Sequence, residues 1–156
     1  MADTVPDVSA GTALVWCSGL LAAAAAVSAL VGRRWSRWLL WASSAAILLA
    51  TCILARGFWQ LDWSYAEVAL HSRRDLAAPL RLAGLWSGAT GSLLFWTAVV
   101  SAVLAWGVRF QTANRDEDAP LLRTVTWGGV LMASHVGAIV AFTEPFARLS
   151  LPPVDG

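Results

Sequence analysis

Apolar residues are concentrated in four long segments, and all of the charged residues lie outside them. The segments run approximately from Thr12 to Val31, Trp38 to Ala55, Ser92 to Val108 and Thr124 to Phe142. A helix needs roughly 20 apolar residues to cross the hydrocarbon core of a bilayer, where it satisfies its own backbone hydrogen bonds. The pattern therefore predicts an all-α, polytopic membrane protein with about four transmembrane helices, which form a single transmembrane domain over residues 1–156.

The composition supports this prediction. Hydrophobic residues make up 58% of the chain, charged residues make up 13%, and the mean hydropathy is +0.62. A soluble domain of this size rarely has so apolar a composition. We therefore expect membrane lipid around the chain and no nucleic-acid partner.

The charges around the first apolar segment predict the orientation. Residues 1–8 carry two aspartates and no basic residue, whereas a cleaved signal peptide begins with a positive region, so we interpret this segment as a retained helix. The turn after it holds Arg33, Arg34 and Arg37, and cytoplasmic loops usually carry the excess of basic residues. We therefore expect both termini and residues 56–91 on the extracytoplasmic side, and residues 109–123 inside.

The predicted outer loop nevertheless carries four arginines, Arg56, Arg73, Arg74 and Arg81. Extracytoplasmic arginines can hold carboxylates, such as the propionates of a haem, by charge-assisted and often bidentate hydrogen bonds. Alternatively, Arg56 and Arg81 extend towards lipid phosphates, while Arg73 and Arg74 are solvated beside Asp75. The sequence leaves both interpretations open.

Ten tryptophans are present, and most of them fall near the predicted helix ends. Trp86 and Trp96 flank the start of the third apolar segment. An indole at a membrane surface buries its ring and keeps its N–H in water, which explains such aromatic belts without haem. The same residues would also form a flat platform for a porphyrin, so their positions alone do not separate the two roles.

Two stretches carry a more specific signal. Residues 65–96 contain, in order, Tyr65, His71, Ser72, Pro79, Trp86, Gly91, Ser92, Leu93, Leu94 and Trp96. Residues 142–156 contain Pro145, Phe146, Arg148, Pro152, Pro153, Asp155 and Gly156. In residue type, order and place beside a helix, both stretches resemble the CcmF branch of the CcmF/CcsA family, integral membrane proteins that carry haem to apocytochrome c for covalent attachment.

The resemblance implies a place in the bacterial inner (plasma) membrane and a role in cytochrome c maturation. It covers the N-terminal portion of the family, which continues into a tryptophan-rich haem-binding domain. The chain would then be a scaffold for a haem domain supplied in trans by a C-terminal CcmF-like chain or other maturation proteins, and at most a subunit of a haem lyase. The surface expected to face haem or apocytochrome c consists of Trp86, Trp96, Arg73, Arg74, Arg81 and His71.

Two positions qualify this implication. The glutamate that usually precedes Gly-Ser in the family is Thr90 here, which favours a second hypothesis, a non-catalytic small subunit of a transporter or respiratory assembly. A truncated fragment is a third. His71 stands where the family tolerates histidine or asparagine, so a hydrogen-bonded loop residue is the alternative to an iron ligand.

The remaining candidates for chemistry are few. His135 lies in the middle of the fourth segment, where an ionisable side chain has either a function or an interhelical hydrogen bond. Cys17 and Cys52 lack the C-x-x-C spacing of thiol exchange, and we expect them to be packing residues. We expect Ser92 or Thr90 to cap the third helix. The sequence contains no phosphate loop, no His-Glu-x-x-His and no nucleophile elbow.

Overall fold

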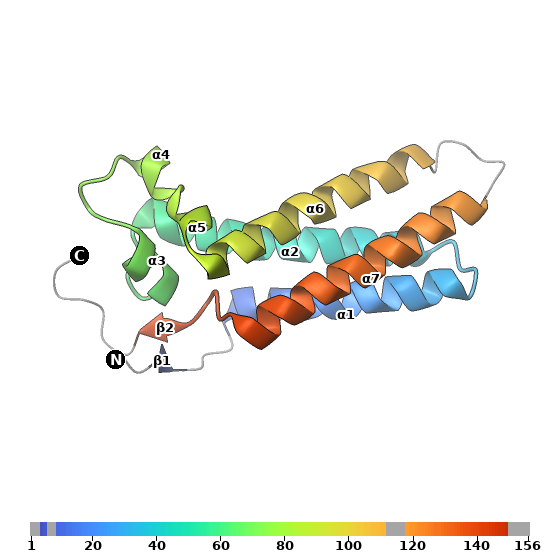
Figure 1. Ribbon diagram of the computed structural model, residues 1–156, viewed down its shortest axis with the longest axis horizontal. Coiled ribbons are helices and arrows are strands. Elements are labelled where there is room, and N and C mark those ends of the chain that lie inside the picture. The colour runs from blue at the N-terminus through green and yellow to red at the C-terminus, as the bar shows by residue number, and fades with distance from the viewer. Residues whose placement is uncertain (1–3, 6–8, 112–117, 150–156) are drawn as a thin grey trace.

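The computed structural model describes residues 4–5, 9–111 and 118–149 (Figure 1). Its long helices are α1 (Ala10–Leu30), α2 (Ser36–Gln60), α6 (Ala89–Gln111) and α7 (Asp118–Phe142). All four are long and apolar enough to cross a membrane, which confirms the predicted all-α fold with four transmembrane helices. Of the predicted inner loop, residues 112–117 lie outside the described residues.

Each long helix extends beyond the apolar segment that predicted it. α2 continues through Arg56 to Gln60, and Arg56 Nε donates a hydrogen bond to Gln60 Oε1 at 3.1 Å. Long polar side chains permit this extension because they keep their charged groups at the membrane surface. Part of the predicted outer loop is also helical, as α3 (Ala66–His71), α4 (Ala78–Arg81) and α5 (Gly84–Ser87).

The long helices run alternately up and down in an elongated bundle (Figure 1). α1 packs against α2 and α7, and α6 packs against α2 and α7. Small residues bring α1 and α7 close together: a Cβ at Gly129 would lie 2.6 Å from the Ala22 carbonyl oxygen, and one at Gly19 would lie 2.8 Å from Val136 Cγ1. Such close backbone contact is how helices associate where lipid provides no hydrophobic drive.

Serine hydroxyls link the helices inside the bundle. Ser18 Oγ donates to Ser43 O at 3.0 Å, and Ser43 Oγ donates to Ser18 O at 2.8 Å, which joins α1 to α2. Ser44 Oγ donates to Ser101 O at 3.2 Å and joins α2 to α6. All four side chains are buried, so these bonds fix the register of three helices where no water competes.

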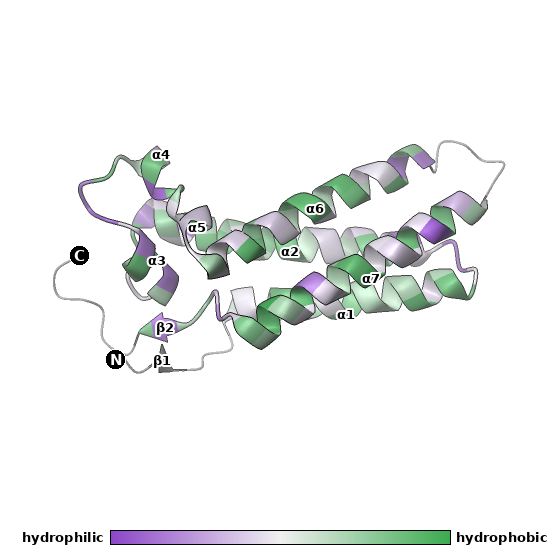
Figure 2. Ribbon diagram, viewed as in Figure 1, coloured by the Kyte–Doolittle hydropathy of each residue, from purple (hydrophilic) through white to green (hydrophobic). Residues whose placement is uncertain are grey.

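One end of the bundle is closed by the short elements, and we call it the capped end. It comprises α3, α4, α5, the first turn of α6, and the antiparallel strands β1 (Thr4–Val5) and β2 (Arg148–Leu149) (Figure 1). The turn between α1 and α2, residues 31–35, lies at the opposite end. Figure 2 shows hydrophobic residues along most of the long helices and hydrophilic residues concentrated towards the two ends, as a transmembrane bundle requires.

Candidate functional site

At the capped end, the two stretches that carry the motif residues meet. Tyr65 is buried, and its ring lies edge-on to that of Phe146, with centroids 6.3 Å apart and an interplanar angle of 73°. The Arg148 guanidinium carbon lies 5.3 Å from the centroid of the Tyr65 ring, a cation–π contact. Ala66 N donates to Ala147 O at 2.9 Å. Segments far apart in the sequence thus form one cluster.

Two glycines fit this cluster between α1 and α2. A Cβ on Gly11 of α1 would overlap the Phe146 ring, and one on Gly57 of α2 would lie 3.2 Å from Tyr65 Cδ2. The aromatic pair therefore packs directly on the backbones of both helices. The further motif residues Pro152, Pro153, Asp155 and Gly156 lie outside the described residues.

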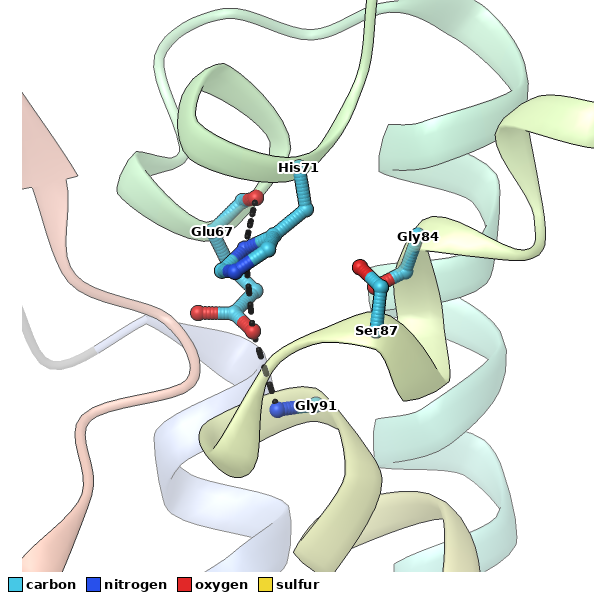
Figure 3. Close-up of polar contacts among 5 residues, drawn as sticks. All are labelled: Glu67, His71, Gly84, Ser87 and Gly91. Carbon is cyan, nitrogen blue, oxygen red and sulfur yellow. Dashed lines mark hydrogen bonds and ion pairs between the residues drawn. The ribbon is translucent and has the colours of Figure 1, made fainter.

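Beside the cluster, Glu67 projects from α3 towards the start of α6 (Figure 3). It is 7% exposed, and its Oε1 accepts a hydrogen bond from the Gly91 backbone N–H at 3.0 Å. The first N–H groups of a helix lack partners within the helix, and the helix dipole favours negative charge beside them. Thr90 and Ser92, predicted to cap this helix, lie inside its first turn, so the carboxylate from α3 takes that role instead.

His71 packs against the Glu67 side chain. Its Nδ1 lies 3.2 Å from the Glu67 carbonyl oxygen and 3.5 Å from Glu67 Oε1. Glycine at position 88 makes room for the pair, because a Cβ there would lie 2.6 Å from Glu67 Oε1 and 2.7 Å from His71 Nε2. Both ring nitrogens of His71 therefore lie against the protein backbone, and the side chain is 28% exposed.

The predicted tryptophans form a surface together with a residue that the sequence did not single out. Trp86 of α5 and Trp96 of α6 both contact Phe95, with centroids 5.6 Å apart in each pair and interplanar angles of 46° and 73°. Trp86 is 52% exposed and Trp96 is 56% exposed. We refer to Trp86, Phe95 and Trp96 as the aromatic surface.

Arg81 is bonded to the backbone of the capped end. Its Nε donates to Leu76 O at 2.8 Å, while Nη1 donates to Trp59 O and Nη2 to Arg74 O, each at 3.4 Å. Trp59 lies in the last turn of α2, where carbonyl oxygens lack partners within the helix. Arg81 therefore ties α4 both to the end of α2 and to the loop before α4.

The other two predicted arginines are exposed on the loop after α3. Arg73 forms a bidentate pair with Asp75, with Nε 3.0 Å from Oδ1 and Nη2 2.6 Å from Oδ2. Such an exposed pair stabilises a protein by at most about 1 kcal/mol, so another carboxylate can compete for the guanidinium. Arg74 lies beside it in sequence and is also exposed.

The remaining candidates lie in the long helices. His135 Nδ1 lies 2.9 Å from Leu131 O of its own helix, so this nitrogen bonds within α7 and not between helices, which was one of the two interpretations that the sequence left open. Cys17 and Cys52 are free and exposed on α1 and α2, so the prediction that they are packing residues is wrong. Among the described residues, no group of three or more His, Cys, Asp or Glu could hold a metal ion.

The capped end thus offers an exposed aromatic surface, exposed guanidinium groups and a buried carboxylate beside an imidazole. A flat conjugated ring can stack on aromatic faces, and carboxylates pair with guanidinium groups. The sequence analysis missed Glu67. The signal was present, because Glu67 is the one acidic residue among the apolar residues from Ala66 to Leu70, and a carboxylate that is buried there needs a partner. That partner is 24 residues away, where no spacing rule reaches.

The chain is 36% identical over 116 residues to the probable cytochrome c-type biogenesis protein NrfE of Escherichia coli K12, a match that covers 74% of the chain and 20% of NrfE. NrfE of Haemophilus influenzae is 29% identical over 74% of the chain, and the cytochrome c-type biogenesis protein CcmF of Escherichia coli K12 is 30% identical over 76%. These matches cover 19% and 18% of the relatives, so the chain spans about a fifth of their length. No family model and no solved structure matches the chain.

Proposed function

We propose that this chain, a homologue of the cytochrome c-type biogenesis proteins NrfE, CcmF and Ccl1, acts in cytochrome c maturation as a membrane scaffold for a haem-binding domain supplied by a partner. The homology supports the role in maturation, and the four apolar helices support the membrane location. A C-terminal CcmF-like chain, or another maturation protein, would provide the parts of the relatives that this chain does not match.

The observation that carries the proposal is the meeting of the two motif stretches at the capped end. Tyr65 from one stretch and Phe146 and Arg148 from the other contact one another, so the residues that resemble the family build one structure. The same end displays the aromatic surface. A scaffold that presents a haem-binding partner to apocytochrome c needs its partner-facing groups gathered in this way.

Haem is the cargo in this proposal, and the residues divide into two roles. Trp86 and Trp96 are exposed and would stack against the porphyrin or the haem domain, while Arg73 and Arg74 are exposed and would pair with propionates. Arg81 and His71 would support that surface from beneath, because their polar atoms already face protein backbone.

The placement of charge supports the proposed orientation. Arg33, Arg34 and Arg37 lie at the end opposite the capped end, and basic residues favour the cytoplasmic side. The capped end and both termini would then be extracytoplasmic in a bacterial inner membrane. The resemblance to the CcmF-type proteins implies that apocytochrome c is matured outside the membrane, so this orientation would put the aromatic surface on the required side.

The test replaces Trp86 and Trp96 together by alanine in cells that depend on this chain for cytochrome c. Both side chains are more than half exposed, so the fold should persist while haem-stained holocytochrome c falls. The matched control replaces Trp106 and Trp127, which are 66% and 68% exposed on α6 and α7 away from the capped end, and it should leave the stain unchanged. Equal staining for both double variants, at equal chain abundance on immunoblots, would remove the aromatic surface from the proposal.

A further inference from the structure

A cavity of about 260 Å³ lies beside the capped end, between the first turns of α1 and the last turns of α7. Val15 and Trp16 of α1, and Ile139 and Val140 of α7, contribute apolar side chains to its lining. Phe146, which follows α7, contributes its ring as well. No residue of the aromatic surface lines this cavity, although it shares Phe146 and Ala147 with the cluster in which the two motif stretches meet.

The cavity exists because α1 and α7 are in close contact on either side of it. Gly19 packs against Val136 on the side nearer the bundle centre, and Gly11 packs against the Phe146 ring beyond the end of α7. Between these two glycine contacts, the lining residues of α1 and α7 leave a gap. The gap falls within the ends of two membrane-spanning helices, at the boundary between hydrocarbon and headgroups.

The apolar part of this lining does not hold water well, whereas lipid chains are present all around it in the membrane. Since lipid tails are as apolar as the lining, burial of the tail gives little selectivity, and polar groups at the rim decide which lipid binds. Thr12 Oγ1 is hydrogen-bonded to Ser9 Oγ at 3.0 Å, and Thr143 Oγ1 donates to Ile139 O at 2.8 Å. Both threonine hydroxyls are therefore already engaged.

Among the described residues that line the cavity, Glu144 is the charged one. It is exposed, and in the described part of the chain no hydrogen bond or ion pair involves its carboxylate. A carboxylate at the level of the headgroups attracts a cationic group that has several N–H donors. It repels a phosphate headgroup that carries no such cation. A primary ammonium on an acyl-chain lipid meets both requirements.

We propose that this cavity is a binding site for an ethanolamine phospholipid, with part of one acyl chain in the cavity and the ammonium on the Glu144 carboxylate. Trp16 is 52% exposed at the rim, where an indole favours the headgroup region. The bound lipid would lie against Phe146 and so would support the contact between the two motif stretches. The site goes beyond the proposed role in cytochrome c maturation and does not depend on it.

The test uses the full chain, purified in mild detergent, delipidated and titrated with phosphatidylethanolamine or phosphatidylglycerol of identical acyl chains. Native mass spectrometry would report the lipid bound per chain. We expect one site that prefers phosphatidylethanolamine by about threefold to fivefold, a ratio within the range of an exposed charge pair. Glu144→Gln keeps the size of the side chain and should abolish the preference, while Val140→Trp should fill the cavity and lower binding of both lipids.

Circular dichroism would verify that both variants keep the helical content of the wild type. Glu144 is exposed, so Glu144→Gln tests the proposal even if Val140→Trp does not fold. Equal affinity for the two lipids, or a preference for phosphatidylethanolamine that survives Glu144→Gln, would overturn the proposal. Neither outcome touches the proposed maturation role, which is read from holocytochrome c.

Discussion

Replacement of Glu67 by alanine should destabilise the capped end. The carboxylate is 7% exposed, and its Oε1 accepts the Gly91 N–H at 3.0 Å, so the variant leaves a buried donor without its partner. A hydrogen bond to a charged group is worth about 1.5–3 kcal/mol, and loss of a helix N-cap costs about 1 kcal/mol. Both values describe the loss of the same contact and are not added, so we expect the free energy of unfolding to fall by about 2 kcal/mol.

Glu67→Gln separates the hydrogen bond from the charge. The amide oxygen of glutamine can still accept the Gly91 N–H, so only the attraction between the carboxylate and the helix dipole is lost, typically about 0.3–1 kcal/mol. Asp75→Ala is the matched control, because it removes an acidic side chain from an exposed pair with Arg73. That pair contributes less than about 1 kcal/mol after screening by solvent.

The assay is unfolding of the purified chain by increasing mole fractions of sodium dodecyl sulfate in a mild detergent, followed by far-ultraviolet circular dichroism. Hydrogen exchange at the Gly91 amide gives a local measurement, which should be faster in Glu67→Ala and nearly unchanged in Glu67→Gln. If Glu67→Ala lost no more stability than Asp75→Ala, or if its Gly91 amide exchanged at the wild-type rate, the capping role would be wrong.

Two further predictions concern other polar contacts. Arg81→Lys should leave the Leu76, Trp59 and Arg74 carbonyls incompletely bonded, because an ammonium lacks the forked shape of the guanidinium. We expect proteases to cleave residues 72–83 faster in this variant, while circular dichroism shows that the four long helices are intact. Ser43→Ala should remove one of the two reciprocal hydrogen bonds between α1 and α2 and lower the free energy of unfolding by about 0.6 kcal/mol. The same detergent titration would measure this change. Ser134→Ala is the control, because its exposed hydroxyl bonds within α7, and it should have a smaller effect.

The transmembrane helices could be predicted because each of them corresponds to a long apolar run in the sequence. Their ends were not, since the run stops at the first charge while the helix continues, as α2 does past Arg56 to Gln60. The capped end depends on contacts between distant residues, such as Glu67 with Gly91 and Tyr65 with Phe146. No periodicity encodes such pairs, so sequence patterns named several of the residues without showing which of them touch.

Arg81 shows the limit of inference from residue type. As an arginine in a predicted outer loop, Arg81 was a candidate to bind a haem propionate. In the structure, its three nitrogens all donate to backbone carbonyls. A guanidinium is suited to either partner, and only the fold decides between them. Exposed Arg73 pairs with Asp75, as the second interpretation of the sequence expected, and its pairing with a haem propionate stays a prediction.

The aromatic surface depends on the buried contacts behind it. Trp86 lies on α5 and Trp96 on α6, so their spacing is set by the turn between these helices, which contains Gly88. Contacts with α3 hold that turn in place, because Gly88 packs on His71 and Glu67 accepts a hydrogen bond from the first turn of α6. A Cβ at position 88 would collide with both side chains, so the turn could not keep its place without glycine. A flat partner needs such a fixed surface, since two tryptophans on an unsupported loop would lose conformational entropy on binding.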